Sequence, residues 1–287
     1  MDQVQKNPLK AFMRRPKLYL KLPSKGEFWP EGSIDYPENG ELPVYGMTAK
    51  DEMMIRTPDA LFNGTSTVEV VRSCIPNIKD PWMIPSLDLD AILIAIRIAS
   101  YGEKMPMNVY IPVVGEEEEF EIDLRPMLDD IINNTTWDTE VKVNNDITVY
   151  IEPVNYKAMT EYQIINFDSN RALQVMLQDD GMTESQKLEL AAVTMSKLAE
   201  GTVMQLRNGV KRIDTSEGNT TDPKFISEFV ENIDKDIFGI LAEAFRARNK
   251  DNNTRTVTIM TPPQFVEKGA PEKIEVPFQF DYSSFFV

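Results

Sequence analysis

The sequence SLDLDAILIAIRIASYG, residues 86–102, is the most apolar part of the chain and predicts the centre of its core. Asp88 and Asp90 lie in the first turn of the predicted helix, where negative charge interacts favourably with the helix dipole. Gly102 is placed to end the helix, because glycine accepts the left-handed conformation common at helix C-termini. Residues 91–99 are apolar on nearly every helical face, so we expect burial on most sides. At about 15 residues the helix is shorter than the roughly 20 that a membrane span needs.

Three further helix starts precede this segment, within residues 47–76. Two of them have the spacing of a capping box, in which two side chains three residues apart each accept from the other's backbone N–H. A third has Pro at the first helical position, where its fixed φ fits and its missing N–H costs nothing. With residues 86–102 they predict a small helical core. The three patterns are Thr48 with Asp51, Ser66 with Glu69, and Thr57-Pro58-Asp59.

The pattern changes to an alternation of apolar and polar residues after Gly102. Such alternation is typical of strands with one buried face. It predicts two antiparallel hairpins, the first made by residues 107–111 and 120–124 around a Glu-rich turn. The second is made by residues 137–143 and 147–151.

Helical patterns return from Tyr156 and continue to about residue 250. Thr160 with Gln163 and Thr183 with Gln186 have capping-box spacing. The second of these helices carries one stripe of apolar residues. Val210 to Thr221 is predicted to be a polar connection between helices. The stripe consists of Leu188, Ala191, Ala192, Met195, Leu198 and Ala199.

These patterns predict an α+β fold with five segments. A final strand pair, residues 255–260 and 274–280, is expected to return to the central hairpins and close one interleaved body. The segments are a basic arm and loop at 1–46, a helical core at 47–104, β-hairpins at 105–154, a helical region at 155–250, and a closing hairpin with an aromatic tail at 251–287.

The composition favours a packed protein with little affinity for nucleic acid. Hydrophobic residues make up 42% of the 287, and the formal net charge is −16. Nucleic-acid binding requires clustered Lys and Arg that replace counterions. The charge is uneven, since residues 1–25 carry +6 and the remainder −22. We expect this basic arm to lie on an acidic surface of its own chain or of a neighbour; a solvated arm is the alternative.

Cysteine and histidine usage excludes most catalytic and metal chemistry. The chain has no His and one Cys, Cys74, so neither a Ser-His-Asp nor a Cys-His arrangement can form, and a His/Cys zinc cluster is excluded. The sequence also has no phosphate-binding loop and no EF-hand pattern. Asp88 and Asp90 are interpreted as first-turn charges, with metal ligation as the alternative. We therefore predict no catalytic residues, no cofactor and no metal.

A carboxylate-dependent enzyme is the alternative that the residues leave open. Glycoside hydrolysis needs only two carboxylates, roughly 5–9.5 Å apart, and the chain has 46 acidic residues. The sequence identifies no particular pair among them.

Several aromatic residues are candidates for binding a partner. Phe28 and Trp29 lie in a loop, and Trp82 lies in a Pro-rich connection. Phe285 and Phe286 end the chain, where two exposed aromatic rings are costly in water. Aromatic side chains often anchor protein interfaces, although packing on their own domain is the alternative for the loop aromatics.

Long pieces of this chain resemble one known family. The pieces include Met47-Thr48-Ala49-Lys50-Asp51-Glu52, Cys74-Ile75-Pro76-Asn77, Ile84-Pro85-Ser86-Leu87-Asp88 and Ala99-Ser100-Tyr101-Gly102-Glu103. Together with Leu22-Pro23-Ser24-Lys25-Gly26 they resemble the baseplate hub assembly proteins of T4-like contractile-tailed bacteriophages. The resemblance covers nearly the whole chain and is most specific over residues 47–102.

The resemblance implies a structural or chaperone-like viral protein of the central baseplate hub. Its partners would be other phage baseplate hub and tape-measure proteins, with self-association left open. The single cysteine fits a reducing compartment, and the N-terminus lacks the apolar segment of a signal peptide. The implied location is the host cytoplasm during tail assembly, with retention in the tail baseplate of the virion left open. A tail hydrolase of cell-wall polysaccharide is the alternative function.

One feature departs from the family pattern. Similar proteins often carry a C-P-x-C-G knuckle in the middle hairpin and a further Cys pair near the C-terminus, which suggests a structural zinc. Here the corresponding pieces read Ile111-Pro112-Val113-Val114-Gly115 and Met260-Thr261-Pro262-Pro263. If the two hairpins still meet, we expect a small hydrophobic contact in place of the metal.

Overall fold

The computed structural model describes Leu9 and residues 13–56, 64–111, 115–178, 181–253 and 255–278. The predicted helix start at Thr57-Pro58-Asp59 and the terminal residues Phe285 and Phe286 lie outside these residues. The fold is α+β, as predicted: of the described residues, 51% are helical and 22% lie in strands, which form small antiparallel sheets.

The central helix of the first core is α4 (Ser86–Tyr101), the segment that the sequence predicts to be buried. Every residue from Ala91 to Ile96 has no exposed surface. The paired strands β1 (Pro16–Leu20) and β2 (Leu42–Tyr45) pack on it. So do the helices α3 (Thr65–Cys74) and α5 (Leu124–Asn134). Helix α1 (Ala49–Ile55) and the short 3₁₀ turn η2 (Pro81–Met83) pack against α3.

The helix ends of this core confirm some predicted caps and correct others. Thr48 and Asp51 form the predicted capping box, and Gly102 ends α4 with φ 94°. The Ser66–Glu69 box is wrong, because Gly64 precedes α3 in a left-handed conformation. The Ser66 hydroxyl instead donates to the carbonyl oxygen of Met54, across the α1–α3 corner.

The second core lies around a four-stranded antiparallel sheet ordered β5-β6-β7-β8. The prediction of a polar connection at 210–221 is wrong, because Val210 and Ile213 are buried and the segment adds two strands to the predicted hairpin. The strands are β5 (Glu140–Lys142), β6 (Ile147–Ile151), β7 (Val210–Thr215) and β8 (Gly218–Thr220); α8 (Pro223–Asn232) and α9 (Lys235–Asn253) pack beside them.

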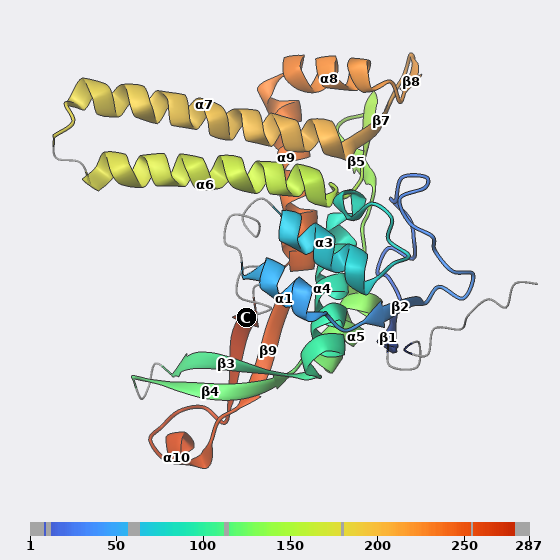
Figure 1. Ribbon diagram of the computed structural model, residues 1–287. Helices are drawn as coiled ribbons and strands as arrows, with labels where there is room; N and C mark the ends of the chain where they lie inside the picture. Colours follow the sequence, from blue (N-terminus) through green and yellow to red (C-terminus); the bar gives the residue numbers. More distant parts are fainter. Residues whose placement is uncertain are drawn as a thin grey trace, which may run out of the picture.

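Two long helices, α6 (Tyr156–Gln178) and α7 (Glu184–Gly209), form an antiparallel hairpin that projects from the body (Figure 1). The Thr183–Gln186 capping box is present as predicted. The Thr160–Gln163 box is wrong, since the helix starts at Tyr156 and the Thr160 hydroxyl donates to the Tyr156 carbonyl within it. Among the described residues, none of the helices combines the length and apolar character of a membrane span.

The closing strand pair lies beside the first hairpin. The first hairpin is β3 (Lys104–Ile111) with β4 (Glu116–Asp123), and the closing pair is β9 (Arg255–Met260) with β10 (Lys273–Phe278). β9 contacts β4, and the short helix α10 (Pro263–Val266) lies between β9 and β10 in the chain. Buried Ile111, Phe265 and Ala270 form a third, small core with Phe120 and Ile274. This hydrophobic contact joins the two hairpins, as the sequence predicts.

Candidate functional site

Asp88 is a fully buried carboxylate that holds the loop of residues 22–29. One of its oxygens accepts from the backbone N–H of Ser24 at 2.8 Å. The other accepts from the Ser24 hydroxyl at 2.5 Å and from the Trp29 indole Nε1 at 2.8 Å. Burial raises the pKa of Asp88 to about 6, and the hydrogen bonds from Ser24 and Trp29 act against that rise. All three donors come from this chain, so the carboxylate serves as a structural anchor.

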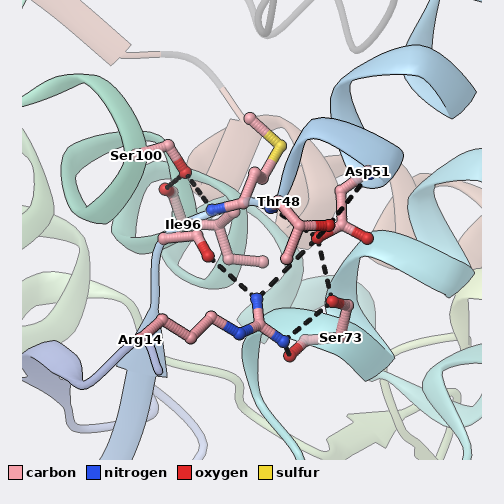
Figure 2. Close-up of polar contacts among 8 residues, drawn as sticks. Arg14, Thr48, Asp51, Ser73, Ile96 and Ser100 are labelled. Carbon is pink, nitrogen blue, oxygen red and sulfur yellow. Dashed lines mark hydrogen bonds and ion pairs between the residues drawn. The ribbon is translucent and has the colours of Figure 1, made fainter. Parts of the chain in front are cut away.

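Arg14 joins the basic arm to three elements of the first core (Figure 2). Its guanidinium donates to the carbonyl oxygen of Gly46 at 2.9 Å and to both the carbonyl oxygen and the hydroxyl of Ser73, at 2.5 and 3.0 Å. The buried Asp51 carboxylate lies 3.8 Å away and accepts from the Thr48 N–H and the Ser73 hydroxyl. Here the arm lies on an acidic group of its own chain.

The network around Arg14 also fixes the start of α1 against α4. The Ser100 hydroxyl donates to the Ile96 carbonyl one turn earlier and accepts from the backbone N–H of Met47 (Figure 2). Gly46 passes close to α4, so that a Cβ there would lie 2.7 Å from the carbonyl oxygen of Ala99. Neighbouring Cys74 is fully buried, and burial raises the pKa of its thiol to about 12. Such a thiol stays protonated and is a poor nucleophile.

Two of the predicted partner-binding aromatics, Trp29 and Trp82, contact their own chain. Trp29 is half-buried against the first core and donates to Asp88. Trp82 stacks on Tyr156 with ring centroids 5.7 Å apart, which joins η2 to the start of α6. Phe28 is half-buried with φ 65°. Phe285 and Phe286 lie outside the described residues, so partner binding by these five residues stays a prediction.

The carboxylates show no arrangement for metal chemistry in the described part of the chain, where no three acidic or Cys side chains gather closely enough to hold an ion. Asp88 and Asp90, the alternative metal ligands, belong to the same helix turn, and Asp88 is held by its own loop. Burial also raises the pKa of Glu152, and the positive charge of Lys211 opposes that rise.

The α6–α7 hairpin presents a surface that the sequence analysis did not identify. The two helices meet along a narrow seam whose middle residues are small or polar, with Ser169, Thr194 and Gly201 buried. A Cβ on Gly201 would lie 3.2 Å from the Tyr162 ring, which shows how closely the helices approach. Six large apolar side chains of the hairpin are at least half exposed: Phe167, Val175, Leu177, Leu188, Val193 and Met195.

The predicted apolar stripe on α7 therefore divides between two faces. Ala191 and Leu198 lie in the seam with α6, whereas Leu188 and Met195 are 70% and 56% exposed. The sequence did indicate a second apolar face on α7. A stripe with two adjacent pairs, 191–192 and 198–199, is wider than a single helix–helix contact requires.

A cleft of about 510 Å³ lies where α9 crosses the base of the hairpin. Met159 and Asn166 of α6 and Thr202 and Leu206 of α7 line one side, and Ala242, Phe245 and Arg246 of α9 line the other. The base of this hairpin face is thus covered by a helix of the same chain, and its outer part is open.

Comparison with known proteins assigns the chain to a family. A family profile described as "T4 bacteriophage base plate protein" matches residues 37–259. Searches of curated proteins and of solved structures gave no significant match. The matched region includes α4, both hairpins preceding α6 and the whole α6–α7 hairpin. With the profile covering well over half of its length, the chain belongs to the T4 bacteriophage base plate protein family.

Proposed function

We propose that this protein is a non-enzymatic structural or assembly protein of the central baseplate hub of a contractile-tailed phage, and that it binds other hub or tape-measure proteins. The observation that carries the proposal is the family match over residues 37–259. The hub assignment rests on the resemblance of residues 47–102 to hub assembly proteins.

The physical character of the molecule supports a role in binding. Its best-placed candidate for unusual acid chemistry, Asp88, is enclosed by donors from its own loop. The single thiol is buried and stays protonated. By contrast, the chain presents a projecting helical hairpin with exposed apolar side chains, a feature typical of interaction sites.

The test is co-expression of the protein with the hub and tape-measure proteins encoded in the same phage genome. We expect an affinity-tagged copy to co-purify with at least one of them, and electron microscopy of the intact baseplate to show it at the hub. Co-purification with peripheral baseplate proteins alone would contradict the hub assignment, although it would still agree with a role in the baseplate.

A peptidoglycan-clearing assay on the purified protein tests the non-enzymatic half of the proposal. We expect no clearing above a heat-treated sample. Clearing that disappears when one acidic residue is changed to its amide would establish the hydrolase instead.

A further inference from the structure

The helices α6 and α7 each carry two neighbouring seams with heptad spacing. The first, through Ser169 and Thr194, is the contact between the two helices. The second seam consists of residues spaced alternately four and three positions apart, all on one face of the hairpin. We name this second seam the outer seam. On α6 the outer seam is Met159, Gln163, Asn166, Asn170, Leu173 and Leu177. On α7 it is Leu188, Ala192, Met195, Ala199, Thr202 and Leu206.

Burial along the α7 side of the outer seam decreases from the base of the hairpin to its tip. Leu206 at the base is 1% exposed in the second core, and α9 lies over this end across the cleft. Met195 is 56% exposed, and at the tip Leu177 and Leu188 are 74% and 70% exposed. One continuous face is therefore covered by a helix at one end and open at the other, as Figure 1 shows by the length of hairpin beyond α9.

The outer seam contains no charged residue, although 26% of the chain is charged. The opposite side of α7 has the character of a solvated surface, since Glu189, Lys197 and Glu200 surround Val193 there. A face that is uncharged over about 27 Å of each helix is the pattern of a buried bundle face.

We propose that the outer seam binds the outer seam of a second copy of this chain, so that two hairpins form an antiparallel four-helix bundle about a two-fold axis. In such a bundle each helix uses two seams, one within its hairpin and one across to the other pair. Each chain carries a net charge of −16, so two copies approach most favourably through a surface free of like charges. The inference is independent of the hub assignment.

The size of the outer seam sets the expected strength of the dimer. The open part of the outer seam, from Leu188 to Ala199 on α7, is about 17 Å long and two helices wide. It buries on the order of 1,000 Å² from both copies together, near the lower limit of specific interfaces. We therefore expect a dimer that dissociates on dilution.

The experiment is analytical ultracentrifugation of the full chain over a dilution series, with Met195→Lys as the test variant and Val193→Lys as the matched control. The two residues have similar exposure, 56% and 50%, and lie two positions apart on opposite sides of α7. We expect wild type and the control to dimerise alike, and Met195→Lys to weaken dimerisation at least about tenfold, because it buries two unpaired ammonium groups. Unchanged far-UV circular dichroism confirms folding.

Three outcomes would overturn the proposal: a wild type that is monomeric at the highest concentration, a Met195→Lys variant that dimerises like wild type, or equal weakening by Val193→Lys. A monomeric wild type would mean that the outer seam binds a single helix of a different protein instead of a second copy.

Cysteine crosslinking gives a second measurement that does not depend on a charged substitution. The one native cysteine, Cys74, has no exposed surface, so an introduced thiol reports on its own position. We expect Met195→Cys to form disulfide-linked dimers under mild oxidation and Val193→Cys to remain monomeric. The reverse pattern would place the contact on the other face and contradict the proposal.

Discussion

At the scale of single residues, Asp88 shows how a buried charge fixes the position of a loop. The carboxylate accepts three hydrogen bonds, two from Ser24 and one from Trp29. These bonds satisfy the charge, but its removal from water still disfavours the ionised form, and its pKa rises to about 6. The sequence predicted the position of Asp88 in the first helix turn. It could not predict the partners, because they lie 59 and 64 residues away in the chain.

The raised pKa of Asp88 makes part of the stability depend on pH. An unfolded Asp titrates at about 3.9, so between about pH 4 and pH 6 the folded chain holds the extra proton and loses stability as the pH rises. We expect the Asp88→Asn variant not to lose this stability as the pH rises, because its amide does not titrate. From about pH 5 to about pH 7.5, the free energy of unfolding of wild type should fall by roughly 1.4 kcal/mol relative to the variant.

Urea unfolding at the two pH values measures this difference, and the subtraction cancels the titration of the other carboxyl groups. Both values lie above the isoelectric point of about 4.6, so the protein keeps its solubilising charge. A difference that is constant with pH would show that Asp88 has the same pKa in the folded and unfolded chains. The amide also places an N–H₂ group near the Trp29 N–H, so we expect the variant to be less stable at about pH 5.

At the scale of elements, local patterns predicted the helix ends where the partner is near in the chain. Thr48 with Asp51 and Thr183 with Gln186 are capping boxes as predicted, because both partners belong to the same turn. The predicted Ser66–Glu69 capping box is wrong because the Ser66 hydroxyl donates to the carbonyl oxygen of Met54, which belongs to a different helix. The strand at 210–215 was missed because its exposed charged residues, such as Lys211 and Arg212, outnumber its two buried residues and make the segment read as polar.

The seam between α6 and α7 contains one hydroxyl that weakens it. The Ser169 Oγ is buried and has no hydrogen-bond partner. We expect Ser169→Ala to stabilise the protein by about 1 kcal/mol, because it removes an unsatisfied polar group and improves helix propensity. Urea denaturation followed by far-UV circular dichroism gives the value.

Ser196→Ala is the control for that measurement, because Ser196 is exposed on α7 and the same change there alters helix propensity alone. A gain for Ser169→Ala no larger than for Ser196→Ala would mean that the buried hydroxyl costs nothing. The sequence could not reveal this cost, since it depends on how closely the two helices approach.

At the scale of the whole molecule, the third core decides whether the two hairpins act as one unit. Phe265 is 3% exposed and packs with Ile111 and Ala270. We expect Phe265→Ala to cost about 3–5 kcal/mol locally and to release β3–β4 from β9–β10. Hydrogen exchange should then accelerate in residues 104–111 and 116–123, while the amides of α4 keep their protection.

The comparison for this prediction is Phe225→Ala, which removes a phenyl ring that is 60% exposed on α8. That change should leave exchange in the hairpins as it is in wild type. Unchanged exchange in Phe265→Ala as well would mean that strand pairing alone holds the hairpins, and that the third core has no structural role.

The first core has a consequence for how the protein is made. Its side chains run from Leu18 in the first strand to Phe278 in the last, and Val257 packs against the same cluster. Residue 278 must therefore be made before the first core is complete. Until then the nascent chain exposes apolar surface that is prone to aggregate.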